Sequence, residues 1–275
     1  MTLSASIARS LADDALTDAL EIAKAHLKSN PSDKEARHIY IDLLILQGDY
    51  ERADAQCGLA TTLAGEDMIG FALLRNQLRA MAAREAWFMT GAVPEFPQGP
   101  SQLDKAVVKL NIAHQSGLRE ETAAALAALE QDRGEQPMVW NGKAVVDFRD
   151  LDDRTPHALE VIMTGGAYLW IDFAKIASVA IEPIARPRDL AFRRAELSLI
   201  DGATASVLLP AIYHGSGGEE RLLLGRETKW ADEDTGITTG RGQRCFLAGD
   251  DLVSFHEAES VEAAGLPGER KAANG

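Results

Sequence analysis

The spacing of the apolar residues changes near Gln136-Pro137, and this change limits the fold more than any other feature of the chain. Before it, apolar residues recur at every third or fourth position, as in residues 16–27, which predicts helices. After it, short runs of branched and aromatic residues alternate with turn residues, which predicts strands. Because the helices come first and the strands follow, the sequence predicts an α+β fold. The predicted parts are a helical domain (1–135), a mostly antiparallel β domain (136–262) and a disordered tail (263–275).

The first helices repeat with a period of 34 residues. Leu16 aligns with Tyr50, and Ala19 with Ala53, at the offset of a tetratricopeptide helix pair. One and a half such repeats cannot bury a core alone, so further helices are expected to pack on them. The segments that supply these helices are 68–88, 101–117 and 118–132. The sequence therefore predicts a tetratricopeptide-like N-terminal part.

Four short stretches give local predictions. Ser32, with Glu35 three positions later, predicts a capping box at the start of a helix. Asp201-Gly202 predicts a type I′ hairpin, because both central positions of that turn require φ > 0. Residues 172–180 are expected to hold a single helical turn, and residues 221–230 a strand.

Composition disfavours several classes of partner. The formal net charge is −14 and no basic cluster stands out, so a nucleic acid or an anionic membrane surface is not expected as a partner. No stretch reaches 18 uncharged apolar residues, and the N-terminus lacks the features of a secretory signal. Cys57 and Cys245 lie far apart, which suits a reducing compartment. The sequence predicts a cytoplasmic protein without membrane insertion.

The glycine-rich stretch GRGQRCFLAGD, residues 240–250, raises the question of a phosphate site. A P-loop needs a lysine and a hydroxyl residue that open a helix, and a dinucleotide fingerprint needs a third glycine in register. Neither is present, so the stretch predicts a turn that feeds a late strand. The six histidines occur singly, without HExxH or a Cys/His cluster, so no metal and no cofactor are expected.

The loop YHGSGGEE, residues 213–220, offers the best candidate for catalysis. Ser216 lies between glycines, with His214 nearby, which is typical of a small hydrolase or esterase. A nucleophile elbow, however, lies on a strand-to-helix turn, and this loop lies between two predicted strands. A flexible hairpin loop is the alternative interpretation.

Stacked helix pairs leave an apolar groove that receives a peptide or a helix of another protein. Tyr40, Leu44 and Tyr50 are the residues expected to line such a groove here. The alternative is that these three side chains pack against the next helix pair.

An ordered series of motifs runs through the chain. It consists of WNG at 140–142, AYLWIDFAKI at 167–176, RPRDLAFRRAELSLIDG at 186–202, VLLPAIY at 207–213, LLGRETKW at 223–230 and GRGQRCFLAGD at 240–250. This series resembles the ImpE family, also called SciE or TagJ, an accessory protein of bacterial type VI secretion. The resemblance covers nearly the whole chain, because the family also begins with tetratricopeptide-like helices. It implies a non-enzymatic protein and carries over no catalytic residues.

The resemblance also implies partners. Members of the family are cytoplasmic, and some bind the small subunit of the contractile sheath through a short apolar helix at that subunit's N-terminus. They are connected with the ATPase that dismantles the sheath, while other branches lack a demonstrated need for sheath binding. The resemblance and the expected groove both favour capture of a partner helix, and contact through the β part is the alternative.

Five polar residues within two of these motifs form a further candidate surface. Arg241, Gln243 and Arg244 either brace the β part against the helices or face a partner. Arg188-Asp189 offers charges with which these arginines could pair, which favours bracing.

Overall fold

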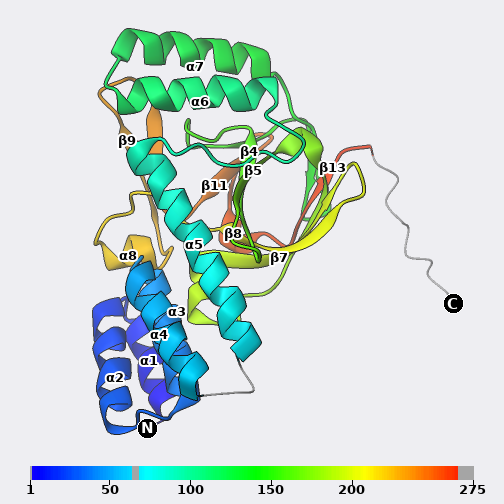
Figure 1. Ribbon diagram of the computed structural model, residues 1–275. Coiled ribbons are helices and arrows are strands. Elements are labelled where there is room, and N and C mark those ends of the chain that lie inside the picture. The colour runs from blue at the N-terminus through cyan, green and yellow to red at the C-terminus, as the bar shows by residue number, and fades with distance from the viewer. Residues whose placement is uncertain (1, 64–67, 266–275) are drawn as a thin grey trace, which may run out of the picture.

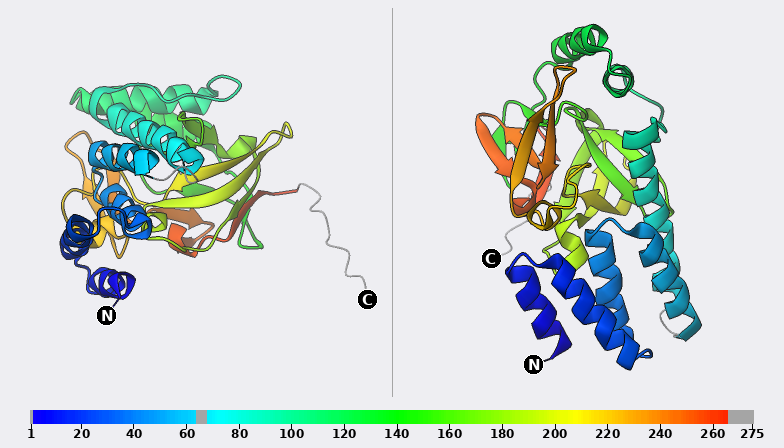
Figure 2. Two further views of the ribbon diagram at one scale, coloured as in Figure 1. Left: turned by 60° about the horizontal axis from the view of Figure 1, so that its bottom comes forward. Right: turned by 90° about the vertical axis from the view of Figure 1, so that its left-hand side faces the viewer.

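The computed structural model describes residues 2–63 and 68–265, and it packs helices against one face of a curved sheet (Figures 1 and 2). The helices are α1 (Leu3–Ala12), α2 (Leu16–Ser29), α3 (Lys34–Leu46), α4 (Tyr50–Leu63), α5 (Met68–Thr90), α6 (Gln102–Gln115), α7 (Arg119–Arg133) and α8 (Glu220–Leu223). The strands are β1 (Met138–Trp140), β2 (Lys143–Val145), β3 (Phe148–Asp150), β4 (Ala158–Met163), β5 (Tyr168–Asp172), β6 (Ile176–Ile181), β7 (Phe192–Leu199), β8 (Thr204–Pro210), β9 (Thr228–Asp232), β10 (Thr238–Gly242), β11 (Cys245–Ala248), β12 (Asp251–Ser254) and β13 (Ser260–Ala263). Long helices precede the strands, so the predicted α+β class is confirmed.

The first five helices pack as consecutive antiparallel neighbours. The pairs α2–α3 and α4–α5 begin at Leu16 and Tyr50, the two positions that the 34-residue period aligns. Helix α5 then runs past the sheet towards the α6–α7 pair at the opposite end of the molecule (Figure 1). Of the helices that the structure describes, none combines the length and apolar character needed to cross a membrane.

The capping box predicted at Ser32 is wrong, because Asp33 caps α3 instead. Asp33 Oδ1 accepts a hydrogen bond from Ala36 N at 3.0 Å, and Asp33 Oδ2 lies 2.8 Å from His26 Nε2. A carboxylate interacts more favourably than a hydroxyl with the partial positive charge at a helix N-terminus. The helix therefore begins one residue later than the predicted box implies.

The large sheet has eight strands in the order β2-β1-β13-β6-β7-β8-β4-β5, and its neighbours pair antiparallel (Figure 1). Two smaller sheets, β10-β9 and β12-β11-β3, complete the β part. At the β5 edge, the segment after α5 adds one isolated bridge: Glu95 N donates to Tyr168 O at 3.0 Å, and Trp170 N donates to Glu95 O at 3.1 Å. The helical part therefore covers an edge of the sheet as well as one face.

Strand β4 shows how the sheet buries both of its faces. Ala158 and Ile162 belong to the core that the helices share, whereas Leu159 and Val161 belong to a second core on the other face. This alternation follows from the two-residue period of a strand. Glu160 has the same parity as Ala158 and Ile162, so its carboxylate points towards the helices.

The β7–β8 hairpin is confirmed, but its turn is not type I′. Among the described residues, positive φ occurs at Gly202 (+91°) and not at Asp201. Gly202 N donates to Leu199 O at 2.9 Å, and Leu199 N donates to Ala203 O at 2.8 Å. This pattern is a three-residue hairpin loop in which the last residue takes the left-handed conformation. The single helical turn expected within 172–180 is confirmed at Phe173–Lys175.

The end of the described chain lies in the sheet. Ala263, which the predicted tail includes, belongs to β13 and pairs with Met138 of β1. Residues 266–275, which make up most of that predicted tail, lie outside the described residues.

The strand predicted over residues 221–230 is half wrong, because its first part forms the short helix α8. Helix α2 lacks a side-chain cap of its own at Ala15. Glu220 of α8 supplies one: its carboxylate accepts hydrogen bonds from Leu16 N at 2.8 Å and Thr17 N at 3.0 Å. The β part thus caps a helix of the N-terminal part, a long-range contact that no local pattern encodes.

Replacing Glu220 with alanine should lower the free energy of unfolding by about 1 to 2 kcal/mol, as loss of a helix cap does. The reason is that two N–H groups of α2 lose their acceptor. Urea denaturation followed by circular dichroism measures the change. Glu219→Ala is the matched control, because Glu219 pairs only with Lys229 on the exposed surface among the described residues. Equal stability of the Glu220 variant and the control would contradict the capping role.

Candidate functional site

A groove with a volume of about 650 Å³ lies between α1 and α3 and is bounded at one end by residues 185–187. Both helices pack against α2, which separates them. Each contributes one face with the spacing i, i+3, i+4, i+7, as expected for two helices that line a common groove. The lining residues are Ser4, Ile7, Ala8 and Leu11 from α1, and Glu35, His38, Ile39 and Asp42 from α3.

The walls of this α1–α3 groove are apolar at depth and polar at the rim. Ile7 and Leu11 are buried, whereas Ala8 between them is exposed. A small side chain at Ala8 leaves room above the apolar floor. On the other wall, Ile39 is half-buried and Glu35 is exposed. The groove therefore has the dimensions and the polarity pattern that suit an amphipathic helix.

The residues predicted to line a groove lie elsewhere. Leu44 is fully buried, and Tyr40 is buried with its hydroxyl bonded to Arg52 Nη2 at 2.8 Å. Both pack in the core, so the packing alternative describes them and a groove-lining role does not. Tyr50 is half-buried, contacts the Phe192 ring at 6.4 Å between centroids, and lines a separate cavity of about 330 Å³. The sequence signal that was missed is the Ile7–Leu11 spacing in the first twelve residues.

The five residues of the predicted polar cluster do not form one cluster. Arg188 Nε lies 3.7 Å from Asp42, and Asp189 Oδ2 accepts hydrogen bonds from Ala185 N and Arg186 N, each at 2.9 Å. The predicted pairing of Arg188-Asp189 with the later arginines is therefore wrong. Each of these arginines has an acid from another element within reach, such as Asp42 for Arg188 and Glu233 for Arg241. Asp189 instead caps the turn at residues 185–189.

The GRGQR stretch is the end of a strand followed by a single β-bridge between Gln243 and Ile212, not the predicted turn. Gly240 and Arg241 lie in β10, opposite Trp230 and Lys229 of β9. Arg241 Nη2 lies 3.1 Å from Glu233 Oε1, which keeps the Arg241 side chain on the β9–β10 hairpin.

The peptide groups around Gln243 pair with residues that precede or open β9. Gln243 N donates to Glu227 O at 2.9 Å, and Thr228 Oγ1 donates to Gln243 O at 2.7 Å. Together with the Arg241 contact, these bonds stay within the β part, so neither residue braces that part against the helices.

Arg244 does brace the two parts, through a buried network centred on Glu160. Arg84 of α5 donates to the Glu160 carboxylate from Nε at 2.7 Å and from Nη2 at 3.0 Å. Arg244 Nη2 bonds to the same carboxylate, and Arg244 Nη1 lies 3.2 Å from Asp150 Oδ2. Burial alone would raise the pKa of Glu160, but Arg84 and Arg244 hold it well below its ordinary value. Sequence reasoning missed Arg84 and Glu160, because 76 positions separate them.

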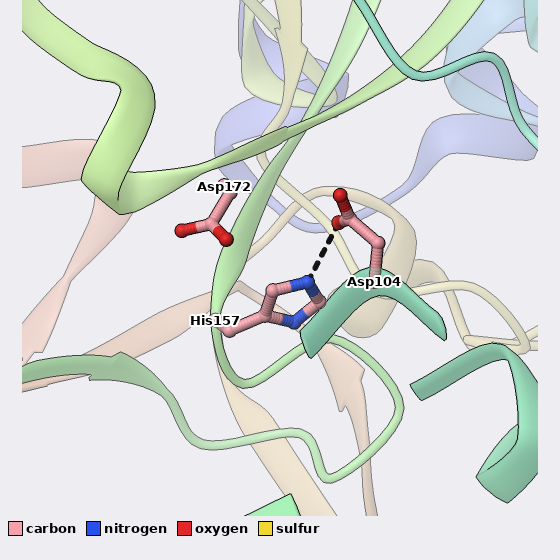
Figure 3. A group of neighbouring side chains, drawn as sticks. All are labelled: Asp104, His157 and Asp172. Atoms are coloured by element: carbon pink, nitrogen blue, oxygen red, sulfur yellow. Dashed lines mark hydrogen bonds and ion pairs between the residues drawn. The ribbon is translucent and has the colours of Figure 1, made fainter. Parts of the chain in front are cut away.

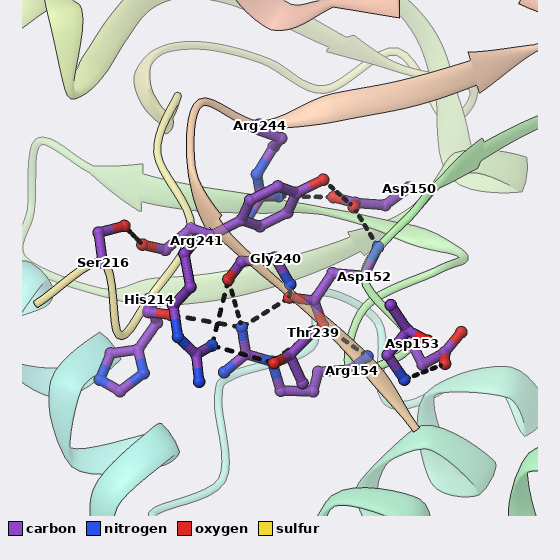
Figure 4. A network of polar contacts seen from close by, with 12 residues as sticks. Asp150, Asp152, Asp153, Arg154, His214, Ser216, Thr239, Gly240, Arg241 and Arg244 are labelled. Atoms are coloured by element: carbon purple, nitrogen blue, oxygen red, sulfur yellow. Dashed lines mark hydrogen bonds and ion pairs between the residues drawn. The ribbon is translucent and has the colours of Figure 1, made fainter. Parts of the chain in front are cut away.

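Ser216 and His214 have separate partners, and Figure 4 draws no contact between their side chains. Ser216 Oγ donates to Tyr213 O at 2.7 Å and accepts from Gly242 N at 2.8 Å. His214 Nε2 lies 2.9 Å from Glu85 Oε2 on α5. A serine nucleophile needs its hydroxyl bonded to the base. This geometry favours the loop interpretation, in which Ser216 ties residues 213–217 to β10.

Asp104, His157 and Asp172 meet in the interior, with ligand-type atoms within 4.8 Å of one another (Figure 3). Asp104 Oδ2 accepts from Ser101 N at 2.6 Å in the capping box of α6, and Asp104 Oδ1 lies 2.8 Å from His157 Nε2. Asp172 Oδ1 accepts from Ala174 N at 2.9 Å. Burial would raise the pKa of Asp104, yet the His157 and Ser101 bonds leave it lowered. Because protein donors already engage these carboxylates, the group fits an anchor between α6 and the sheet better than a cation site.

Comparisons with known proteins cover both parts of the chain. Residues 142–262 match the family described as ImpE protein. The type VI secretion system accessory component TagJ of Pseudomonas aeruginosa is 27% identical over 241 residues, which cover 84% of this chain and 82% of that protein. The crystal structure of protein VPA1032 from Vibrio parahaemolyticus superposes with a TM-score of 0.85 at 27% identity, over 94% of this chain and 97% of the other. The structural likeness therefore covers most of the helical part as well as the β part.

Proposed function

Residues 142–262, the β part of this chain, belong to the ImpE family, and from that premise we propose that the protein is an accessory protein of type VI secretion. We propose further that it is not an enzyme and that it works by binding a helix of a partner protein. The helix would be the short apolar one at the N-terminus of the sheath small subunit, as the family resemblance implies. Through it the protein would act in the cytoplasm alongside the ATPase that dismantles the sheath.

The observation that carries this proposal is the α1–α3 groove. Two helix faces with matching i, i+3, i+4, i+7 spacing leave an apolar trough of about 650 Å³. A docked helix would bury its own apolar stripe there, which contributes roughly 25 cal/mol for each Å² of apolar surface removed from water. Its polar face would remain in solvent.

Ala8→Arg tests this proposal, because it fills the groove from an exposed helical position. Arginine is a good helix former, so α1 should remain folded. We expect the affinity for a fluorescent peptide of the sheath small subunit's N-terminal helix to fall about thirtyfold, as when an interface hot spot is blocked. Fluorescence anisotropy measures the binding, and circular dichroism checks the fold.

Ala12→Arg is the matched control, because Ala12 is exposed on the same helix but does not line the groove. It should bind the peptide like the wild type. Peptide binding that survives Ala8→Arg unchanged would place the binding surface outside the α1–α3 groove. No saturable binding by the wild type would remove helix capture for this chain.

A further inference from the structure

The two ends of the α1–α3 groove differ in charge. Glu35 lies in the first turn of α3, and Asp42 lies two turns further on, about 10 Å along the axis at 1.5 Å per residue. The end near Asp42 carries Arg186, on the segment that joins β6 to β7. Helices α1 and α3 both run from the free end of the bundle towards the β part (Figure 2). The groove therefore has an acidic outer end and a basic inner end.

Arg186 is fixed in place by a buried acid. Its Nε donates to Asp42 Oδ2 at 2.9 Å, and its Nη2 donates to Asp42 Oδ1 at 3.2 Å. The Asp42 side chain is 1% exposed and the Arg186 side chain is 34% exposed. Within residues 2–63 and 68–265, Arg186 Nη1 forms no hydrogen bond, so its N–H groups stay available at the groove.

The inner end keeps an excess of positive charge. Arg188 Nε lies 3.7 Å from Asp42 Oδ1, so one carboxylate faces two guanidinium groups. The nearby Asp189 is occupied by its turn and lies 3.6 Å from Arg194. At the outer end, Glu35 is exposed, and no ion pair of Glu35 is found in the part of the chain that the structure describes.

We infer that this charge difference sets the direction of the captured helix. The helix would lie parallel to α1 and α3, with its N-terminal turn beside Glu35 and its C-terminal turn beside Arg186. The free carbonyls of a helix C-terminus, or an acidic side chain there, would accept hydrogen bonds from Arg186 Nη1. The N–H groups and positive dipole end of the N-terminal turn would face Glu35. This inference rests on the proposed helix capture and adds a polarity to it.

A spin label on a cysteine introduced at Ser4, which lines the outer end of the groove, tests the direction. The native Cys57 and Cys245 are buried, so the label goes to the new site. The probe is the isotope-labelled N-terminal helix peptide of the sheath small subunit. We expect the label to broaden the NMR signals of the peptide's N-terminal residues and to spare those of its C-terminal residues.

Broadening of the C-terminal residues, or of both ends equally, would overturn the inference while leaving helix capture intact. Absence of peptide binding would overturn both the direction and the proposed helix capture. The two outcomes therefore distinguish failure of the inference from failure of the proposed function.

Charge variants provide a second measurement. Arg186→Gln and Glu35→Gln should each weaken peptide binding about fivefold, the scale of a charge at a helix end. Arg9→Gln and Glu51→Gln are the matched controls, because both residues are exposed and neither lines the groove. Arg186 also holds the 185–190 segment to α3, so its replacement could disturb the fold as well as binding. Glu35 is exposed, so its replacement tests the effect of charge on binding without disturbing the fold. Unchanged affinity in both groove variants would overturn the inference.

Discussion

Replacing Glu160 with alanine should lower the free energy of unfolding by about 4 kcal/mol, because breaking a buried ion pair from one side leaves an uncompensated charge. Here the carboxylate serves two guanidinium groups at once. The side chains of Arg84 and Arg244 are only 3% and 2% exposed, so solvent can compensate little of the charge that Glu160 leaves behind. Since Arg84 lies on α5 and Glu160 on β4, the loss should loosen the contact between helices and sheet. Urea denaturation with tryptophan fluorescence measures the change.

Glu182→Ala is the control for this prediction, because Glu182 pairs with Arg194 at 2.9 Å on the exposed surface. Such a pair contributes at most about 1 kcal/mol. A Glu160 variant as stable as this control would contradict the bracing role.

The Glu160 network also predicts a pH dependence. In the folded protein the pKa of Glu160 lies below the ordinary value of 4.5. The ionised Glu160 carboxylate therefore stabilises the fold above pH 4.5, and this stabilisation is lost as the pH falls below 4.5 towards the folded pKa. The loss of stability of Glu160→Gln between pH 7 and pH 3 should therefore be smaller than that of the wild type.

Gly242→Ala should destabilise the protein by about 4 kcal/mol, since overpacking and left-handed backbone strain act at one position. Gly242 has φ +82°, and a Cβ there would lie far inside contact distance of the Glu227 carbonyl oxygen. Its N–H also donates to Ser216 Oγ, so any shift of this strand disturbs the loop that precedes α8. Thermal unfolding by calorimetry measures the effect.

Gly236→Ala separates the two causes. Gly236 has φ +92°, but a Cβ added there would meet no atom of the described residues within 4 Å, so the substitution adds strain without a clash. It should cost about 1 kcal/mol, the scale of a left-handed non-glycine residue. Equal effects of the two substitutions would show that close packing at Gly242 contributes nothing.

The sequence predicted the elements whose signal is local. The 34-residue period located Leu16 and Tyr50 at the starts of α2 and α4, because helix pairs repeat their apolar spacing. Near Gln136 the apolar spacing typical of helices gives way to short runs of branched and aromatic residues. This change predicted where the strands begin, and β1 does start at Met138. The resemblance to the ImpE family rested on an ordered series of motifs and is supported by the match over residues 142–262.

Features that depend on distant partners could not be predicted in this way. The run Leu222–Leu224 predicted a strand over residues 221–230, yet Glu220–Leu223 form α8, and the Glu220 carboxylate caps the N-terminus of α2. Tyr40 and Leu44 lie on the correct helix, α3, but on its buried side. A helix pattern gives the spacing of an apolar face and not which neighbour covers it. The groove is lined by the other face of α3, because α1 lies opposite that face. The position of α1 is set by tertiary packing, which the spacing of apolar residues within α3 does not encode.

The bridge at Glu95 has a consequence for shortened forms of the protein. A fragment that starts at residue 136 would lose the segment that closes the β5 edge and the helices that cover Ile162 and Trp170, both fully buried in the intact chain. Bare strand edges and exposed aromatic surface recruit other copies of the same chain. The fragment should therefore form insoluble aggregates, and residues 142–262 should stay in solution only when they are expressed together with the helical part.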